Sequence, residues 1–150
     1  MSLFDRIRSM IKKPKPETAT VRVEDLLGVS ATFGGVPTHE LADQGKHDLA
    51  TMLACCDAQE SNYWKQPAGE RMCAAPYYFE RVAILCRKAK DYQGEIAICE
   101  RWKAIAKDYG AQPSVRKGWG AQVHKGAREI ALANRAKKAR ELMARAKTRK

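Results

Sequence analysis

Residues 76–109 constrain the fold most, because their apolar side chains recur at the spacing of an α-helix on both sides of one interruption. The apolar residues before the interruption are four, three and four positions apart: Tyr78, Val82, Leu85 and Ala89. Those after it also share one helical face: Tyr92, Ile96, Cys99, Trp102, Ala106 and Tyr109. Pro76 suits a first helical turn, and Asp91 can cap the second helix. The spacing predicts an antiparallel helical hairpin.

The flanking segments predict further helices. Gly110 and Pro113 are expected to end the second helix of the hairpin. Another helix is predicted from Thr38, as N-cap, to about Glu60, followed by a loop that carries Tyr63, whose ring is expected in the core. Its buried side is expected to contain Leu41, Leu49, Met52, Leu53 and Cys56.

The hairpin segment also resembles a known family. Asp91 and Tyr92 match the turn of the tetratricopeptide helix-turn-helix unit, and Val82 and Cys86 match apolar positions of its first helix. The resemblance covers residues 76–109 as a single unit, with no second copy at the family's 34-residue spacing. It implies a helical hairpin and a scaffold that binds other proteins.

Positive charge is concentrated at the end of the chain. The net charge is +11, and 12 of the 28 Lys and Arg residues lie within residues 111–150, together with only two acids. Residues 17–60 are acidic instead, with eight acids and two basic residues. Residues 120–148 contain no proline and are rich in helix formers, so they predict a long helix. The expected fold class is therefore all-α: a small helical domain with the central hairpin and a long basic C-terminal helix.

The C-terminal helix has two apolar strips. The first strip is expected to pack on the hairpin: Trp119, Val123, Ala127 and Ile130. The second strip lies on roughly the opposite side and is expected to project away from the body with the second half of the helix: Leu132, Ala136, Ala139, Met143 and Ala146.

The basic residues predict contacts with the phosphates of DNA or RNA, without reading of base sequence. The candidates near the body are Arg116, Lys117, Lys125 and Arg128. The candidates on the projecting part are Arg135, Lys137, Lys138, Arg140, Arg145, Lys147 and Arg149. The plain alternative is a solvated charged helix that only keeps the protein in solution.

Two other binding roles stay open. In a protein-interaction adaptor or inhibitor, the hairpin would bind a partner while the basic helix docks on an acidic protein surface. The expected partner-binding residues are Tyr78, Arg81, Glu95 and Trp102. In a homo-oligomer, the acidic residues 17–60 of one chain would face the basic helix of another.

No enzyme motif is present, and neither a cofactor nor a small-molecule substrate is expected. His39, Asp43 and His47 are four residues apart, but along a helix the two histidines would be about 12 Å apart, too far to share one metal ion. The five cysteines include no Cys-x-x-Cys pair and are expected to be thiols in the core.

Three units are expected along the chain. Residues 1–16 form a short amphipathic basic segment and linker, residues 17–112 a helical core domain, and residues 113–150 the basic C-terminal helix. Packing of residues 2–12 on the domain's own core is favoured over membrane binding. No stretch has the length and apolar character of a membrane span or a secretion signal, so a cytoplasmic location is expected.

Overall fold

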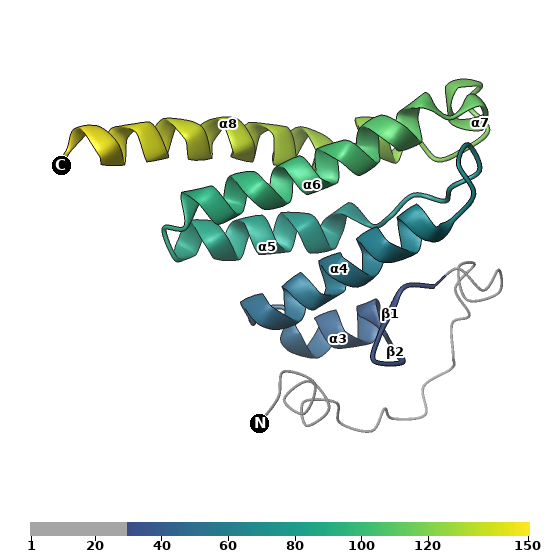
Figure 1. Cartoon of the computed structure of the whole chain (residues 1–150), viewed down its shortest axis with the longest axis horizontal. Coiled ribbons are helices and arrows are strands. Elements are labelled where there is room, and N and C mark those ends of the chain that lie inside the picture. The colour runs from purple at the N-terminus through teal and green to yellow at the C-terminus, as the bar shows by residue number, and fades with distance from the viewer. Residues whose placement is uncertain (1–29) are drawn as a thin grey trace.

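The structure, a computed structural model, describes residues 30–150, and these are mostly helical (Figure 1). The predictions for residues 1–16 and for residues 17–29 lie outside the described part. A two-stranded antiparallel pair comes first, followed by helices. The elements are β1 (Thr32–Phe33), β2 (Val36–Pro37), α3 (Thr38–Gly45), α4 (Leu49–Lys65), α5 (Pro76–Lys88), α6 (Tyr92–Ala111), α7 (Pro113–Arg116), the 3₁₀ turn η1 (Val123–Lys125) and α8 (Ala127–Thr148).

The helical hairpin is confirmed as α5 and α6. Pro76 is the first residue of α5, and the Asp91 carboxylate accepts a hydrogen bond from the Gly94 N–H at 2.8 Å, which caps α6. Lys90 closes the turn with φ at 57°, and the Asp91 N–H donates to the Cys86 carbonyl. Helix α6 does not end at Gly110, which stays helical, while Pro113 opens the separate short helix α7.

The single helix predicted from Thr38 to about Glu60 is two helices. Asp48 starts α4 because its carboxylate accepts hydrogen bonds from the Thr51 N–H (3.0 Å) and hydroxyl (2.6 Å). At Gly45, a Cβ atom would lie 2.4 Å from Thr51 Cγ2, so the glycine permits the close approach of α3 and α4. Helix α4 then continues to Lys65, beyond the predicted end.

Successive helices stack on one another, and α8 lies across the hairpin (Figure 1). Helix α4 packs on α5, and α8 contacts both α5 and α6. The centre of the core contains Phe79 and Trp102, whose ring centroids are 5.5 Å apart. Tyr63 is buried as predicted, and all cysteines but the half-buried Cys73 are buried free thiols.

The face by which α8 packs differs from the prediction, although Val123 of the first strip packs against the core and Ala146 of the second strip is exposed, both as expected. Leu132, Ala136 and Ala139 of the second strip are buried, whereas Ile130 of the first strip is 59% exposed and Trp119 is 78% exposed. The small alanine side chains of the second strip let the backbone of α8 approach the hairpin closely. The helix therefore packs on α5 and α6 although the strip has little apolar volume. The C-terminal helix therefore belongs to the same core as the hairpin.

Candidate nucleic-acid interface

The residues predicted to bind a partner protein do not form an exposed face. Tyr78, Glu95 and Trp102 are 6%, 0% and 1% exposed, respectively. Arg81 is half-buried, and its guanidinium donates to the Lys46 carbonyl and contacts His47. Helical periodicity identifies a face that becomes buried, and here the covering element is the rest of the domain rather than a partner.

Glu95 is the centre of an ion-pair cluster that joins three helices. Its carboxylate accepts hydrogen bonds from Arg87 of α5, at 2.5 and 2.9 Å, and from Arg135 of α8, at 3.2 Å. Arg87 also donates to the Arg135 carbonyl at 3.3 Å. Arg135, predicted to contact phosphate, is therefore held in a structural cluster.

Three other predicted phosphate ligands have acidic partners at the surface. Arg128 pairs with Glu80 and lies 5.2 Å from the centre of the Tyr77 ring, which ties the start of α8 to α5. Arg140 pairs with Glu100 of α6, and Lys138 with Glu141 within α8. Exposed pairs of this kind contribute little to stability, so exchanging a carboxylate for a phosphate would cost little.

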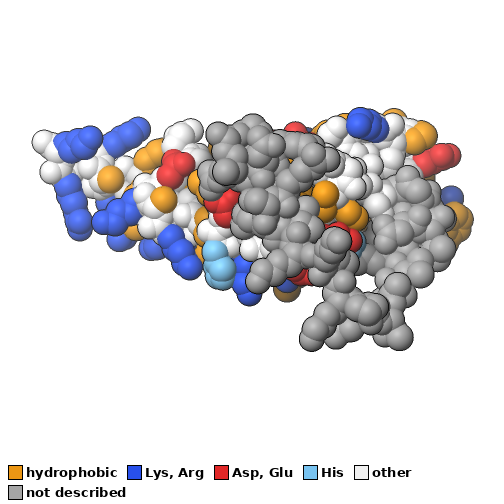
Figure 2. Space-filling view, turned by 90° about the horizontal axis from the view of Figure 1, so that it is seen from below, with side chains coloured by type: hydrophobic (Ala, Val, Ile, Leu, Met, Phe, Trp, Pro, Cys, Tyr) orange, Lys and Arg blue, Asp and Glu red, His pale blue; other side chains and the backbone are white. Residues whose placement is uncertain are grey.

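The remaining predicted cations have no acidic partner within residues 30–150. They are Arg116, Lys117, Lys125, Lys137, Arg145, Lys147 and Arg149, to which Lys150 can be added. Residues 144–150, here called the basic overhang, are exposed on every side, because α8 runs past the α5–α6 turn (Figure 1). Lys and Arg side chains gather at that end of the molecule (Figure 2).

Basic residues also follow the side of α8 that faces α6. Arg140 marks this side, because it pairs with Glu100 of α6. Lys137 precedes Arg140 by three positions and Lys147 follows it by seven, so both lie near the same helical face. The cations thus continue from the overhang back along the body.

A second group of cations surrounds a concave surface at the other end of α6. Lys103 and Lys107 of α6, Arg116 of α7 and Lys125 of η1 line a pocket of about 620 Å³, here called the basic pocket. Lys103 and Lys107 were not predicted, because α6 was interpreted only through its apolar side. Their like charges, four positions apart on one helix, are a sequence signal that could have identified them.

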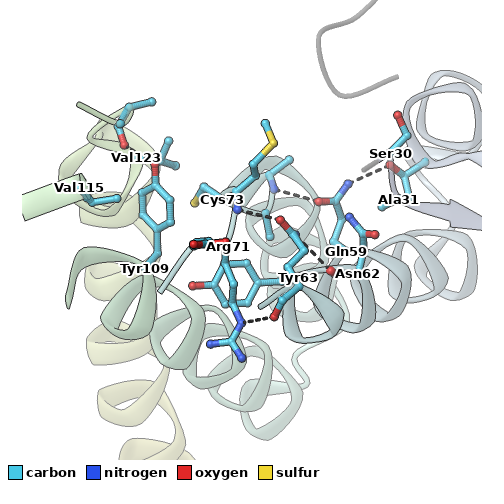
Figure 3. Close-up of a pocket in the computed structure, with 18 of the residues that line it drawn as sticks. Ser30, Ala31, Gln59, Asn62, Tyr63, Arg71, Cys73, Tyr109, Val115 and Val123 are labelled. Atoms are coloured by element: carbon cyan, nitrogen blue, oxygen red, sulfur yellow. Dashed lines mark hydrogen bonds between the residues drawn. The ribbon is translucent and has the colours of Figure 1, made fainter. Parts of the chain in front are cut away.

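A larger cavity of about 650 Å³ lies between α4, α6 and the segment of residues 66–75 (Figure 3). This segment is held by glutamine side chains instead of a sheet. Gln112 accepts from the Arg71 N–H (2.6 Å) and donates to the Arg71 carbonyl (2.8 Å). Gln66 accepts from the Met72 N–H, and Gln59 from the Ala75 N–H.

The cavity combines an apolar rim with unreactive titratable groups. Trp119 and Met72, which are 78% and 36% exposed, lie among its lining residues. Burial raises the pKa of the Cys73 thiol to about 12, so that the thiol stays protonated at neutral pH. Burial and the hydrogen bond that its hydroxyl donates to Asp108, at 2.7 Å, also raise the pKa of Tyr63. Neither group is an activated nucleophile.

The described residues contain neither a metal-binding cluster nor a membrane-spanning helix. Between Ser30 and Lys150, no three His, Cys, Asp or Glu side chains are grouped so that they could hold a metal ion. His39 and Asp43 lie on α3, whereas His47 lies in the turn that follows, so the three do not share one continuous helix. None of the helices in this part of the chain combines the length and apolar character needed to cross a membrane.

Comparison of the chain with protein-family models, with curated proteins and with solved structures found no match. The resemblance of residues 76–109 to a tetratricopeptide unit therefore stays a prediction.

Proposed function

We propose that the protein is a non-catalytic binder of nucleic acid or of a nucleoprotein complex, and that the basic overhang supplies the main contact. The single observation that carries this proposal is the position of Arg145, Lys147 and Arg149. They lie on a helix end that is exposed on all sides and have no acidic partner within the described residues.

The physical basis is electrostatic. Each phosphate that a Lys or Arg neutralises releases condensed counterions, which favours binding and makes it dependent on salt. Cations on several sides of one helix suit the groove of a duplex or the surface of a folded RNA. The part of α8 that carries them has no aromatic side chain, so base stacking, which dominates many single-strand binders, is not the expected mode.

The test compares the full chain with a version that ends at residue 143. This cut removes four cations and no buried residue, whereas a cut near residue 112 would also remove Leu132 and Ala136 from the core. Binding of labelled duplex DNA and structured RNA is measured by fluorescence anisotropy over a range of salt concentrations. If all four cations contact phosphate, the slope of log K against log salt becomes less steep by about 3 to 4.

A pair of charge-matched variants separates a local contact from the effect of net charge. The test variant is Arg145→Gln with Lys147→Gln, Arg149→Gln and Lys150→Gln. The control removes the same charge from exposed lysines outside α8: Lys46→Gln, Lys65→Gln, Lys88→Gln and Lys90→Gln. Binding should weaken strongly in the first variant and little in the second. Equal weakening in both, or no binding by the full chain, would overturn the proposal.

A second candidate function is a protein-interaction adaptor, and the cavity of Figure 3 favours it. The occupant would be an extended peptide segment with apolar side chains. The segment of residues 71–75 has neither helical nor strand structure, and Ala75 at its end is in the extended conformation. Within the described residues the backbone groups of Cys73 and Ala74 form no hydrogen bond, so they could pair with an added strand. Exposed Trp119 would then lie beside the peptide.

This alternative differs from the first in its response to salt. Binding at an apolar cavity should persist at high salt and should be lost in Trp119→Ala, while the four-glutamine variant of the overhang should bind normally. A pull-down at low and high salt with the full chain, the Trp119→Ala variant and the four-glutamine variant distinguishes the two functions.

We also propose that the protein acts in the cytoplasm. The support is its cysteine chemistry, because the cysteines within residues 30–150 are free thiols, as is usual in a reducing compartment.

A further inference from the structure

The basic pocket is built from three separate segments of the chain. Lys103 and Lys107 lie one turn apart on α6, and Arg116 and Lys125 come from α7 and η1. All four side chains are exposed at the pocket. Of these four cations, only Lys103 has an acidic partner within the described residues. That partner is Glu100, and the contact is long, at 3.9 Å.

The one carboxylate in the pocket does not balance this charge. Glu129 accepts a hydrogen bond from the indole N–H of Trp102, so the core engages one of its oxygens. Four cations therefore face a concave surface with a single acid. Like charges that line one concave surface repel each other, and an anion bound among them would relieve the repulsion.

Packing fixes the wall of the pocket. The His124 ring lies over Gly110, where the Cβ of any other residue would be 2.6 Å from the ring Cδ2. The ring also meets the edge of Tyr109, with centroids 5.9 Å apart. His124 Nδ1 is buried without a hydrogen-bond partner in the described chain, so steric contacts hold the ring in place. A wall of this kind keeps the pocket open between the cations.

We propose that the basic pocket binds a phosphate monoester. Such a group carries a charge of about −1.5 to −2 at neutral pH, whereas each phosphate within a nucleic-acid backbone carries one charge, so a cluster of four cations favours the monoester. The source is either the phosphorylated end of a nucleic-acid strand or a small phosphorylated molecule. The site goes beyond the proposed function, because it lies at the opposite end of α8 from the basic overhang, about 30 Å away at 1.5 Å per residue.

The first test follows backbone amide signals of the full chain by NMR during titration with inorganic phosphate, and with sodium chloride at equal ionic strength. Phosphate should shift the amides of Lys107, Gly110, His124 and Lys125 in a saturable way, and chloride should not. The double variant Lys107→Gln with Arg116→Gln should weaken phosphate binding at least tenfold. The matched control, Lys65→Gln with Lys88→Gln, should bind as the natural sequence does.

A variant that changes shape and not charge tests the wall. Gly110→Ala displaces the His124 ring and leaves all four cations in place. Weaker phosphate binding by this variant, with the amide spectrum otherwise retained, supports a built pocket. Unchanged binding would show that the cations act as isolated surface charges and would overturn the proposal.

The source of the monoester is identified with one oligonucleotide, prepared with either a phosphorylated or a hydroxyl end. Tighter binding of the phosphorylated form, lost in the Lys107→Gln and Arg116→Gln variant, assigns the site to strand ends. Saturable binding of a nucleoside monophosphate, without any gain from the end phosphate, assigns it to small molecules.

The two proposals can fail independently. The four-glutamine variant of the overhang should still bind inorganic phosphate at the basic pocket, even if it no longer binds nucleic acid. Amide shifts that phosphate and chloride cause equally would overturn the phosphate site and leave the proposed function untouched.

Discussion

Glu95 lies between Arg87 of α5 and Arg135 of α8, and its side chain is fully buried. A carboxylate loses much hydration on burial, and the two guanidinium groups compensate for that loss. The sequence alone did not show this cluster, because Arg135 is separated from Glu95 by 40 positions and resembles the neighbouring surface cations. Whether a charged residue is a ligand or a structural partner is decided by which helix covers it.

Removal of the Glu95 charge should destabilise the protein strongly. In Glu95→Gln, two partly buried arginines lose their shared carboxylate, and we expect the free energy of unfolding to fall by about 2–4 kcal/mol. Glu100→Gln is the control, because Glu100 pairs with Arg140 at an exposed position and should cost about 1 kcal/mol or less. Urea denaturation measures both. Similar losses for the two variants would contradict the structural role of the Glu95 cluster.

At the scale of the elements, the hairpin was predictable and the docking of α8 was not. The four-three-four spacing before Asp91 predicts the helix, and Tyr78 and Val82 of that strip are buried. The buried face also includes Phe79 and Cys86, whereas Leu85 is only half-buried. In α8, alanines occur on nearly all sides, and the strips with Ile130 and Leu132 have similar apolar character. The choice between them depends on the shape of the surface formed by α5 and α6, which local spacing does not contain.

Two substitutions test the packing face of α8 directly. Leu132→Ala should lower the free energy of unfolding by about 2–4 kcal/mol, since Leu132 is 2% exposed and its loss leaves a cavity. Ile130→Ala, at a side chain that is 59% exposed, should change it by about 0.5 kcal/mol or less. Urea denaturation of the two variants gives the comparison. A larger loss for Ile130→Ala would show that the predicted face packs on the hairpin after all.

Across the whole molecule, charge and thiol chemistry are separated. Within residues 30–150, exposed cations are concentrated on α8 and around the basic pocket, although others such as Lys46 and Lys65 lie elsewhere. The thiols lie mostly inside, where burial raises the pKa values of Cys55 and Cys99 to about 12. The concentration of charge in residues 111–150 was visible in the sequence. The basic pocket was not, because Lys103 and Lys107 meet Arg116 and Lys125 only after α6, α7 and η1 have packed together.

Stability should fall in alkaline solution. In the unfolded chain the thiols ionise near pH 9, while in the folded chain burial holds their pKa values higher. The protonated thiols contribute stability that is fully present below pH 9 and is lost as the pH rises toward 12, by at most about 1.4 kcal/mol per pH unit for each thiol. Urea midpoints at pH 7.5, 9 and 10.5, in high salt to screen changes in lysine charge, measure the loss. A constant midpoint would contradict it.

The packing of α8 across α5 and α6 also has a consequence for biosynthesis. A ribosome releases the hairpin before it releases Leu132, Ala136 and Ala139, which cover one side of it. Until these residues emerge, the nascent chain exposes the apolar side of α6 around Trp102 and lacks the third partner of the Glu95 cluster. The domain therefore completes its core only after residue 139 has left the ribosome, and until then the exposed apolar side of the hairpin is a surface on which nascent chains can aggregate.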